Sequence, residues 1–326
     1  MQIDYVKPST ASADVGEKFF SISDEAFIFE ILRNKMYSNP ILAVVREYSC
    51  NALDSMTECG RGDIPVEITL PTYSDLYFKV KDSGVGISPD RIENIYIKYA
   101  ESTKRNDNSQ IGGFGLGSKA GFAYSDSFTI ITNFEGVKYN YACFIDETKL
   151  GKMALLSKED TSEPNGTTII VPVKSYVDIS YFVGAVEHVC RHWKVKPIVH
   201  NGAVNYKTYN FKAEGSTWAL AEDRNSYYDK ECKVILGNIE YSLRRSDLVN
   251  IPNITSILSK YKSTLVLKMN VGDLTLAANR ESIQLDDKSK LALEKAVQAA
   301  EQEIDQFFQN KIDNIDNFYD AIVLFK

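Results

Sequence analysis

Asp82, Gly84 and Gly86 form a short motif of an acid and two glycines, directly after a stretch that alternates apolar and polar residues. A carboxylate at the end of a strand can accept a hydrogen bond from an exocyclic amine, and glycine lets a flat ring approach the backbone closely. A site of this kind would bind adenine. The same residues also suit an ordinary turn, because short patterns of this type often arise by chance.

A glycine-rich loop between residues 111 and 121 indicates a second kind of chemistry, the binding of phosphate. Its sequence is IGGFGLGSKAG, and it leads into an expected helix start at Ser118. Backbone N–H groups at such a start can surround phosphate oxygens, and Lys119 can add positive charge. The spacing differs from that of a Walker loop and from a dinucleotide-binding fingerprint. A flexible linker is the alternative interpretation.

Two further motifs place polar side chains where they could serve the same site. Glu47, Asn51 and Asp54 follow one another at helical spacing, within an arc of about 60°. Taken alone, an acidic helix face is commonly only a solvated surface. Thr167 follows a glycine at the entrance to a strand, where its hydroxyl could share a water molecule with Asp82 and a bound base.

The elements that must position these motifs can be read from the hydrophobic pattern. Helices are expected over 24–33, 40–59, 91–99 and 178–193, and strands over 64–70, 76–81, 127–133, 137–145 and 167–173. These strands suit a mostly antiparallel sheet backed by the earlier helices. The dipeptide Asn201-Gly202 predicts a hairpin after the next strand. The first domain is therefore expected to be an α/β sandwich.

The same pattern divides the chain into an N-terminal arm, a first domain and a smaller second domain. Their expected bounds are residues 1–20, 21–212 and 213–326. The arm is polar and has few apolar residues to pack. The second domain is expected to hold strands over 233–243 and 264–269, a helix between them, and a long amphipathic helix over about 286–310. The overall fold class is therefore α+β.

Charge and composition narrow the classes of function. The formal net charge of −7 argues against broad electrostatic capture of nucleic acid. The five cysteines are widely separated and include no CxxC pair, so neither a disulfide framework nor a zinc site is indicated. No stretch approaches the ~20 apolar residues of a membrane span, and the first ten residues lack the apolar run of a signal peptide. A cytoplasmic protein is expected.

The order of the four motifs resembles the GHKL family, which is named after gyrase, the heat-shock chaperone, histidine kinases and MutL. The resemblance covers about residues 20–210. The sequence ESTK, ending at Lys104, resembles the polar cluster before the glycine loop in MutL and gyrase. The sequences VVRE at 44–47 and GFGLGSK at 113–119 resemble more closely the N-terminal region of the phage rIIA lysis-inhibition proteins. This family implies a Bergerat-type α/β sandwich followed by a transducer-like domain.

The resemblance also implies a role for each matched residue. Glu47 would be the general base that activates the attacking water, Asn51 a magnesium ligand and Asp82 the adenine reader. Asp54 and Thr167 would support the water network beside the base. The glycines of the adenine pocket would be Gly84 and Gly86, and the phosphate contacts would come from Lys104, Gly113, Gly115, Leu116, Gly117, Ser118 and Lys119.

In these relatives a basic residue from the second domain reaches the terminal phosphate. The loop AANRES makes Arg280 the candidate here, although a basic loop residue is more often ordinary surface. The resemblance thus implies a slow, Mg²⁺-dependent ATPase whose nucleotide drives dimerisation. It also implies an rIIB-like partner and attachment to the inner face of the host membrane.

Two other classes of function stay open at this point. A module that binds nucleotide without hydrolysing it can share every motif, because the rate depends on the placement of Glu47. A histidine kinase fits less well, because such kinases carry the acceptor histidine before the nucleotide motifs. The three histidines here, His188, His192 and His200, all follow them.

Overall fold

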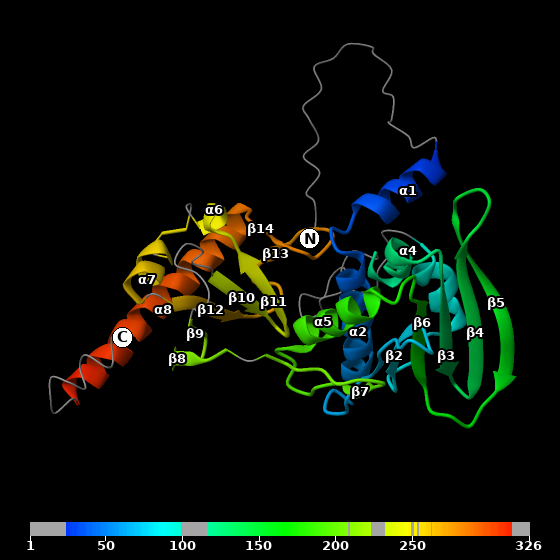
Figure 1. Cartoon of the computed structure of the whole chain (residues 1–326), viewed down its shortest axis with the longest axis horizontal. Helices are drawn as coiled ribbons and strands as arrows, with labels where there is room; N and C mark the ends of the chain where they lie inside the picture. The colour runs from blue at the N-terminus through cyan, green and yellow to red at the C-terminus, as the bar shows by residue number, and fades with distance from the viewer. Residues whose placement is uncertain are drawn as a thin grey trace, which may run out of the picture.

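The computed structural model describes residues 24–98, 116–207, 209–222, 232–248, 251–252, 254–261 and 263–314. Two β-sheets, each packed with helices, lie side by side in this part of the molecule (Figure 1). The expected N-terminal arm, residues 1–20, lies outside the described residues. Among the residues described, every helix is too short or too polar to cross a bilayer.

The first sheet has seven strands in the order β5-β4-β3-β6-β2-β1-β7. Their bounds are β1 (Glu67–Thr69), β2 (Tyr77–Asp82), β3 (Ser127–Phe134), β4 (Val137–Ile145), β5 (Gly151–Asp160), β6 (Gly166–Pro172) and β7 (Ile198–His200). Neighbouring strands run antiparallel except β1 and β7, which are parallel. The mostly antiparallel sheet predicted from the sequence is therefore confirmed.

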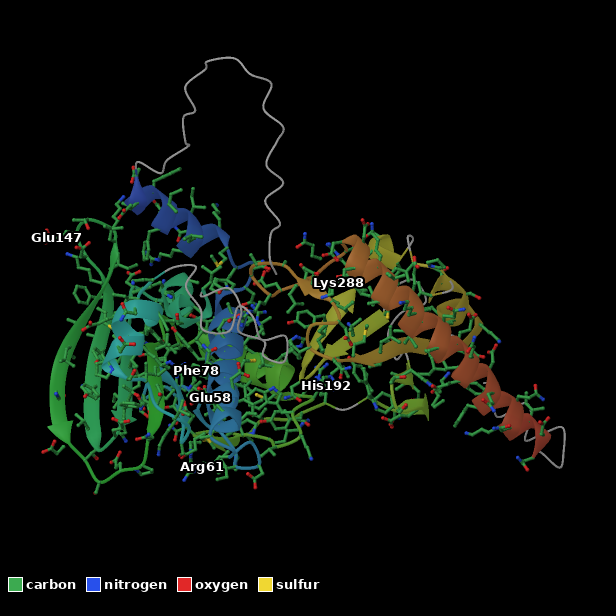
Figure 2. The ribbon with its side chains drawn as sticks, turned by 180° about the vertical axis from the view of Figure 1, so that it is seen from behind. Glu58, Arg61, Phe78, Glu147, His192 and Lys288 are labelled. Atoms are coloured by element: carbon green, nitrogen blue, oxygen red, sulfur yellow. The ribbon has the colours of Figure 1, made fainter. Side chains whose placement is uncertain are left out.

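Helices pack on one face of this sheet. They are α1 (Glu25–Lys35), α2 (Pro40–Glu58), α3 (Pro89–Arg91), α4 (Gly121–Tyr124) and α5 (Asp178–Cys190), with a π-helical turn over Ile92–Tyr96 and a 3₁₀ turn over Gly117–Lys119. Phe78 of β2, labelled in Figure 2, stacks on Phe182 of α5 with 4.9 Å between ring centroids. Both rings are fully buried. This arrangement is the α/β sandwich that the sequence predicted.

Helix α2 carries the polar residues expected in the site, and its start is fixed locally. The side chain of Asn39 accepts a hydrogen bond from the backbone N–H of Leu42 at 3.0 Å, and Pro40 occupies the first helical turn. Val45 and Met56, on the apolar face, are fully buried. The cap fixes the start of α2, and the buried side chains of Val45 and Met56 hold the segment between them against the core.

The second sheet has five strands in the order β11-β10-β12-β9-β8. The elements of this half are β8 (Phe211–Glu214), β9 (Trp218–Glu222), β10 (Cys232–Leu236), β11 (Ile239–Leu243), α6 (Arg245–Leu248), α7 (Ile254–Tyr261), β12 (Ser263–Met269), a two-stranded ribbon of β13 (Thr275–Leu276) and β14 (Ile283–Gln284), and α8 (Asp287–Asp313). Helix α8 packs on this sheet through Phe307, whose ring meets that of Trp218 edge to face. The expected boundary between residues 212 and 213 falls within β8.

The two halves meet where α5 ends beside β11. Glu240 of β11 is buried, and its carboxylate accepts a hydrogen bond from the hydroxyl of Tyr209 at 2.8 Å. The carboxylate also lies 2.7 Å from Nε2 of His192, which is labelled in Figure 2, and 3.4 Å from Nη1 of Arg191. Burial opposes ionisation of Glu240, but the contacts with His192, Tyr209 and Arg191 outweigh it and lower the pKa of Glu240 to about 2. An ion-pair cluster thus joins the halves.

Candidate functional site

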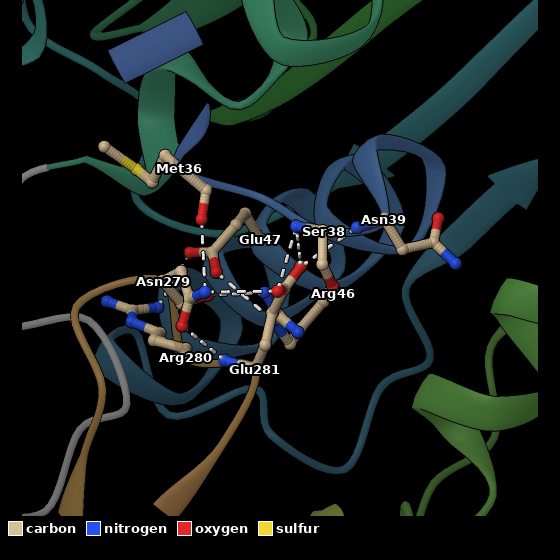
Figure 3. Close-up of polar contacts among 8 residues, drawn as sticks. All are labelled: Met36, Ser38, Asn39, Arg46, Glu47, Asn279, Arg280 and Glu281. Atoms are coloured by element: carbon tan, nitrogen blue, oxygen red, sulfur yellow. Dashed lines mark hydrogen bonds and ion pairs between the residues drawn. The ribbon is translucent and has the colours of Figure 1, made fainter. Parts of the chain in front are cut away.

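Glu47, the proposed base, lies in the middle of α2 and is only 1% exposed. Nε of Arg46 lies 3.3 Å from one of its carboxylate oxygens, and Nη1 of Arg280 lies 2.8 Å from the other (Figure 3). Both arginines are 4% exposed. Burial alone would lower the pKa of Arg280, but the Glu47 carboxylate reverses this effect, so the pKa is raised. The carboxylate of Glu47 is therefore held between two guanidinium groups.

Arg280 reaches this position from the loop between β13 and β14. It lies 233 residues after Glu47 in the sequence. The residue that the sequence singled out as the basic group of the second domain thus lies beside the carboxylate that the sequence singled out as the base. Arg46, which the sequence analysis did not assign to the site, completes the contact by donating a hydrogen bond to the carbonyl oxygen of Asn279 at 2.8 Å.

The end of the glycine-rich loop packs directly on Glu47. A Cβ atom added at Gly117 would lie 2.2 Å from a carboxylate oxygen of Glu47, so only glycine fits there without displacing this side chain. The hydroxyl of Tyr48 donates a hydrogen bond to the carbonyl oxygen of Ser118 at 3.3 Å. The same hydroxyl accepts one from the backbone N–H of Gly121 at 2.8 Å. Tyr48 therefore fastens the loop end to α2.

Lys119 is buried beside this loop end. Its ammonium group donates a hydrogen bond to the carbonyl oxygen of Lys98 at 2.6 Å, and burial lowers its pKa to about 8. The side chain also lines a cavity of about 640 Å³ whose walls include Phe122 and Tyr139. The ammonium group of Lys119 is thus directed to a main-chain oxygen.

Asp82, the expected adenine reader, lies at the end of β2 and is 8% exposed. Its Oδ1 accepts hydrogen bonds from the backbone N–H of Gly84 at 2.9 Å and from the hydroxyl of Ser55 at 3.3 Å. Burial raises its pKa to about 6, although these hydrogen bonds lower it. A Cβ atom at Gly84 would lie 2.1 Å from Oγ of Ser55. The glycine therefore allows the turn to pack against α2.

Threonines complete the wall next to Asp82. Thr167 of β6 is the direct strand partner of Asp82, and its hydroxyl lies 3.3 Å from that of Thr132 on β3. Gly86 has a φ of 73°, and a Cβ atom there would lie 2.3 Å from a main-chain oxygen of β3. The left-handed backbone and the close approach both favour glycine. Asp82, Thr167 and the two glycines thus lie together as one polar cluster.

Helix α2 connects the two clusters. Ser55, which contacts Asp82, comes eight residues after Glu47, and this corresponds to about 12 Å along a helix. Asn51 and Asp54 lie between them on the same helix face and are half-buried. The end of the site at Asp82 is therefore suited to the adenine ring, and the end at Glu47 is suited to charged phosphates.

The donor set suits a magnesium ion that is bound together with phosphate. Mg²⁺ in nucleotide sites is usually held by one or two protein oxygens, phosphate oxygens and water. Asn51 offers a half-buried amide one turn after Glu47. Within the ranges that the structure describes, no three His, Cys, Asp or Glu side chains gather into a cage that could hold a metal ion alone. The residues fit Mg²⁺ carried by a nucleotide.

Some predicted site residues lie outside the part of the chain that the structure describes, and some residues of the site were not predicted. Lys104, Gly113 and Gly115 lie outside the described residues. Four further residues of the site, Arg46, Ser55, Thr132 and Glu281, were not predicted from the sequence. Ser55 follows Asp54 in the acidic helix motif, and Glu281 follows Arg280, so the signal for each was its position next to a predicted residue. Thr132 carried no such signal.

Comparison with known proteins agrees with this geometry. Residues 38–168 match the model of the family described as histidine kinase-, DNA gyrase B- and HSP90-like ATPases. The B subunit of type 2 DNA topoisomerase 6 from Saccharolobus solfataricus is 33% identical over 115 residues, which are 33% of this chain and 22% of that protein. Its counterpart from Sulfurisphaera tokodaii is 33% identical over 118 residues, which are 34% of this chain and 22% of that protein.

The matched segment contains Glu47, Asn51, Asp82 and the glycine-rich loop, so it coincides with the site. The stretches aligned with the two topoisomerase proteins span about a fifth of the length of either one. The match therefore concerns a domain rather than a whole relative. Residues 38–168 are therefore similar in sequence to this family of ATPases, and the mostly antiparallel sheet backed by helices is consistent with the α/β sandwich expected for it.

Proposed function

We propose that the protein binds ATP with Mg²⁺ and hydrolyses it slowly. The observation that carries the proposal is the placement of Glu47, a buried carboxylate about 12 Å along α2 from Ser55, whose hydroxyl contacts Asp82. In this proposal Asp82 accepts a hydrogen bond from the adenine amine, and Thr167 supports it. The phosphates then extend along α2 toward Gly117 and Glu47.

Glu47 would accept the proton of the water that attacks the terminal phosphorus, so that ADP and phosphate are released. Asn51 would ligate Mg²⁺, which when bound neutralises charge between the β and γ phosphates. Arg280 would exchange its contact with Glu47 for the terminal phosphate and stabilise the charge there. The 2.8 Å pair between Arg280 and Glu47 supports this step, because it places the arginine beside the base before nucleotide arrives.

The biological role belongs to the same proposal. We propose that ATP orders the glycine-rich loop and promotes a homodimer, with the N-terminal arm reaching the partner protomer, and that hydrolysis resets this switch. The resemblance of residues 44–47 and 113–119 to rIIA proteins supports a phage lysis-inhibition function, an rIIB-like partner and a site of action at the inner face of the host membrane.

A specific observation favours one alternative, a nucleotide-binding scaffold without turnover. Both carboxylate oxygens of Glu47 contact guanidinium groups, which compete with water for its lone pairs. If Arg280 stayed on Glu47 with ATP bound, hydrolysis would be blocked. A histidine kinase has less support, because His192 and His200 contact Glu240 and Glu67.

The decisive experiment follows phosphate release and molecular mass with ATP and Mg²⁺ for the parent and for Glu47→Gln. We expect the parent to release phosphate and Glu47→Gln to lose at least about a hundredfold in kcat, because general-base catalysis contributes that much. ATP affinity should change less than threefold, and the variant should accumulate as an ATP-bound dimer.

Glu58→Gln is the matched control, because Glu58 lies on the same helix with an exposed side chain. It should hydrolyse ATP at the parental rate. Equal turnover by the parent and Glu47→Gln would rule out the role of Glu47. Binding of ATP by a parent that never releases phosphate would favour the scaffold.

A further inference from the structure

The loop between β13 and β14 docks on the start of α2 through three consecutive residues, Asn279, Arg280 and Glu281 (Figure 3). Arg280 contacts the proposed base, as described above. The other two residues bind the main chain at positions 36–39, just before the helix. The loop therefore attaches at two places, one on the reacting carboxylate and one on the helix start.

Glu281 makes the attachment to the helix start. Its carboxylate accepts hydrogen bonds from the backbone N–H of Ser38 at 3.0 Å and from that of Asn39 at 3.3 Å. These groups lie at the positive end of a 19-residue helix, where a negative charge is stabilised. Because the side chain of Asn39 caps Leu42, Glu281 supplies the acceptor for the N–H groups of this cap residue and of Ser38 before it.

Asn279 braces Glu281 from the other side of Arg280. Its side-chain amide donates to the carboxylate of Glu281 at 3.1 Å and to the carbonyl oxygen of Met36 at 3.1 Å. Its side-chain oxygen accepts a hydrogen bond from the backbone N–H of Glu281 at 3.1 Å. Arg280, between them, has a φ of 54°, a left-handed conformation that a non-glycine residue rarely adopts. The neighbours therefore determine the direction of the Arg280 side chain.

From these contacts we infer that Glu281 is a positioning residue for Arg280. It touches neither Glu47 nor the expected path of the phosphates, and it acts by fixing the loop on the N-terminal end of α2. The anchor point at Ser38 lies two residues before α2, and α2 carries the proposed base Glu47, so anchoring the loop there sets the distance between Arg280 and the base. The inference rests on the proposed ATPase function.

The first test is a double-mutant cycle of Glu281→Ala and Arg280→Ala, with kcat and ATP affinity measured for each protein. We expect Glu281→Ala to lower kcat about ten- to a hundredfold, because a displacement of about 1 Å can cost that much. ATP affinity should stay within twofold, since Asp82 and its pocket are untouched. Glu281→Gln, which keeps an acceptor oxygen, should recover part of the rate.

The cycle separates an indirect role from a merely structural one. If Glu281 acts only through Arg280, the double variant should be as slow as Arg280→Ala alone. Glu301→Ala, a change on α8, is the control and should keep the parental rate. Effects of Glu281→Ala and Arg280→Ala that simply multiply would overturn the inference.

A second measurement shows whether Glu281 anchors the loop, even if the protein does not hydrolyse ATP. Amide hydrogen exchange at Ser38 and Asn39 should become at least tenfold faster in Glu281→Ala, because their N–H groups lose the acceptor. Exchange there should remain parental in Arg280→Ala. Unchanged exchange in Glu281→Ala would refute the anchor. A parent without phosphate release would instead refute the proposed hydrolysis, and the exchange data would still show whether Glu281 holds the loop.

Discussion

Asp82 has two properties that oppose each other. To accept a hydrogen bond from an adenine amine its carboxyl group must be ionised, yet its burial raises the pKa to about 6. The hydrogen bonds from Gly84 and Ser55 to Oδ1 reduce this effect. At neutral pH the carboxyl group of Asp82 is therefore mostly ionised, but its pKa lies only about one unit below that pH. A pH change of one to two units is enough to alter its charge.

We predict that ATP binding weakens as the pH falls through about 6 and that Asp82 is the cause. Below its pKa the carboxyl group is protonated and can no longer accept as an anion, so affinity should fall about tenfold per pH unit. Titration calorimetry between pH 5 and 8 measures this, using a nucleotide analogue that is not hydrolysed. In Asp82→Asn, affinity should be lower at pH 7 and nearly flat with pH.

Asp63→Asn, a change at an exposed carboxylate, is the control and should retain the parental pH dependence. A step near pH 6 that persists in Asp82→Asn would show that another group causes it.

At the scale of elements, the sequence predicted a strand whose apolar residues alternate and missed a strand at the edge of the sheet. The pattern placed a strand at 137–145, and β4 has these bounds, because its apolar residues alternate regularly. Strand β5 was missed because it lies at the edge of the sheet, where most of its side chains are exposed and polar. Its position depends on pairing with β4, which local sequence does not encode.

The hairpin predicted at Asn201-Gly202 is wrong for a related reason. Asn201 does adopt a left-handed φ of 64°, as the dipeptide suggested. However, β7 pairs in parallel with β1, and the next strand, β8, belongs to the second sheet. The dipeptide correctly predicted the left-handed backbone at Asn201. The position of the strand that follows depends on tertiary packing, which the dipeptide does not encode.

The contact between α5 and β2 should be a main source of stability for the first sheet. We predict that Phe182→Ala lowers the free energy of unfolding by about 3–5 kcal/mol, because it removes a fully buried ring that stacks on Phe78. Urea denaturation measures this as a lower midpoint with an unchanged slope.

The neighbouring residue Tyr181 provides the comparison on the same helix. Its side chain is 60% exposed, so Tyr181→Ala should change stability by less than about 0.5 kcal/mol. Similar losses for the two variants would mean that helix propensity, rather than the buried stack, dominates.

At the scale of the whole molecule, the motifs in the first half were predictable and their partners in the second half were less so. The acid, amide and glycine patterns are local, so the sequence identified Glu47, Asp82 and Gly117. Arg280 was proposed from resemblance alone, and its contact with Glu47 spans 233 residues. The contacts of Glu281 and of the cluster at Glu240 depend on how the two halves pack together, and no sequence pattern indicated that packing.

The cluster at Glu240 should hold the two halves together. We predict that Glu240→Ala costs about 3–5 kcal/mol, because it leaves Arg191 and His192 without their buried carboxylate. Calorimetry should show one unfolding transition for the parent and two for the variant. Since the pKa of Glu240 is lowered from 4.5 to about 2, the parent should lose this stabilisation as the pH falls from 4.5 toward 2.

The exposed Glu214 of β8 forms an ion pair with Lys268, and Glu214→Ala is the matched control. It should cost less than about 1 kcal/mol and leave unfolding in one step. A single transition in Glu240→Ala would show that other contacts couple the halves.

The separation between Glu47 and Arg280 has a further consequence during synthesis of the protein. A ribosome adds about 5–20 residues per second, so the 233 residues between them require about 10–50 seconds. Domains generally fold as units, N-terminal first, while the chain is still growing. The first domain is complete only at about residue 212, and the 68 residues from there to Arg280 take about 3–14 seconds. During that shorter interval the nascent first domain can meet cellular ATP with Arg46 as the only one of the two arginines yet made. Translation therefore gives the ATP-binding half a period of existence before the arginine that pairs with its base.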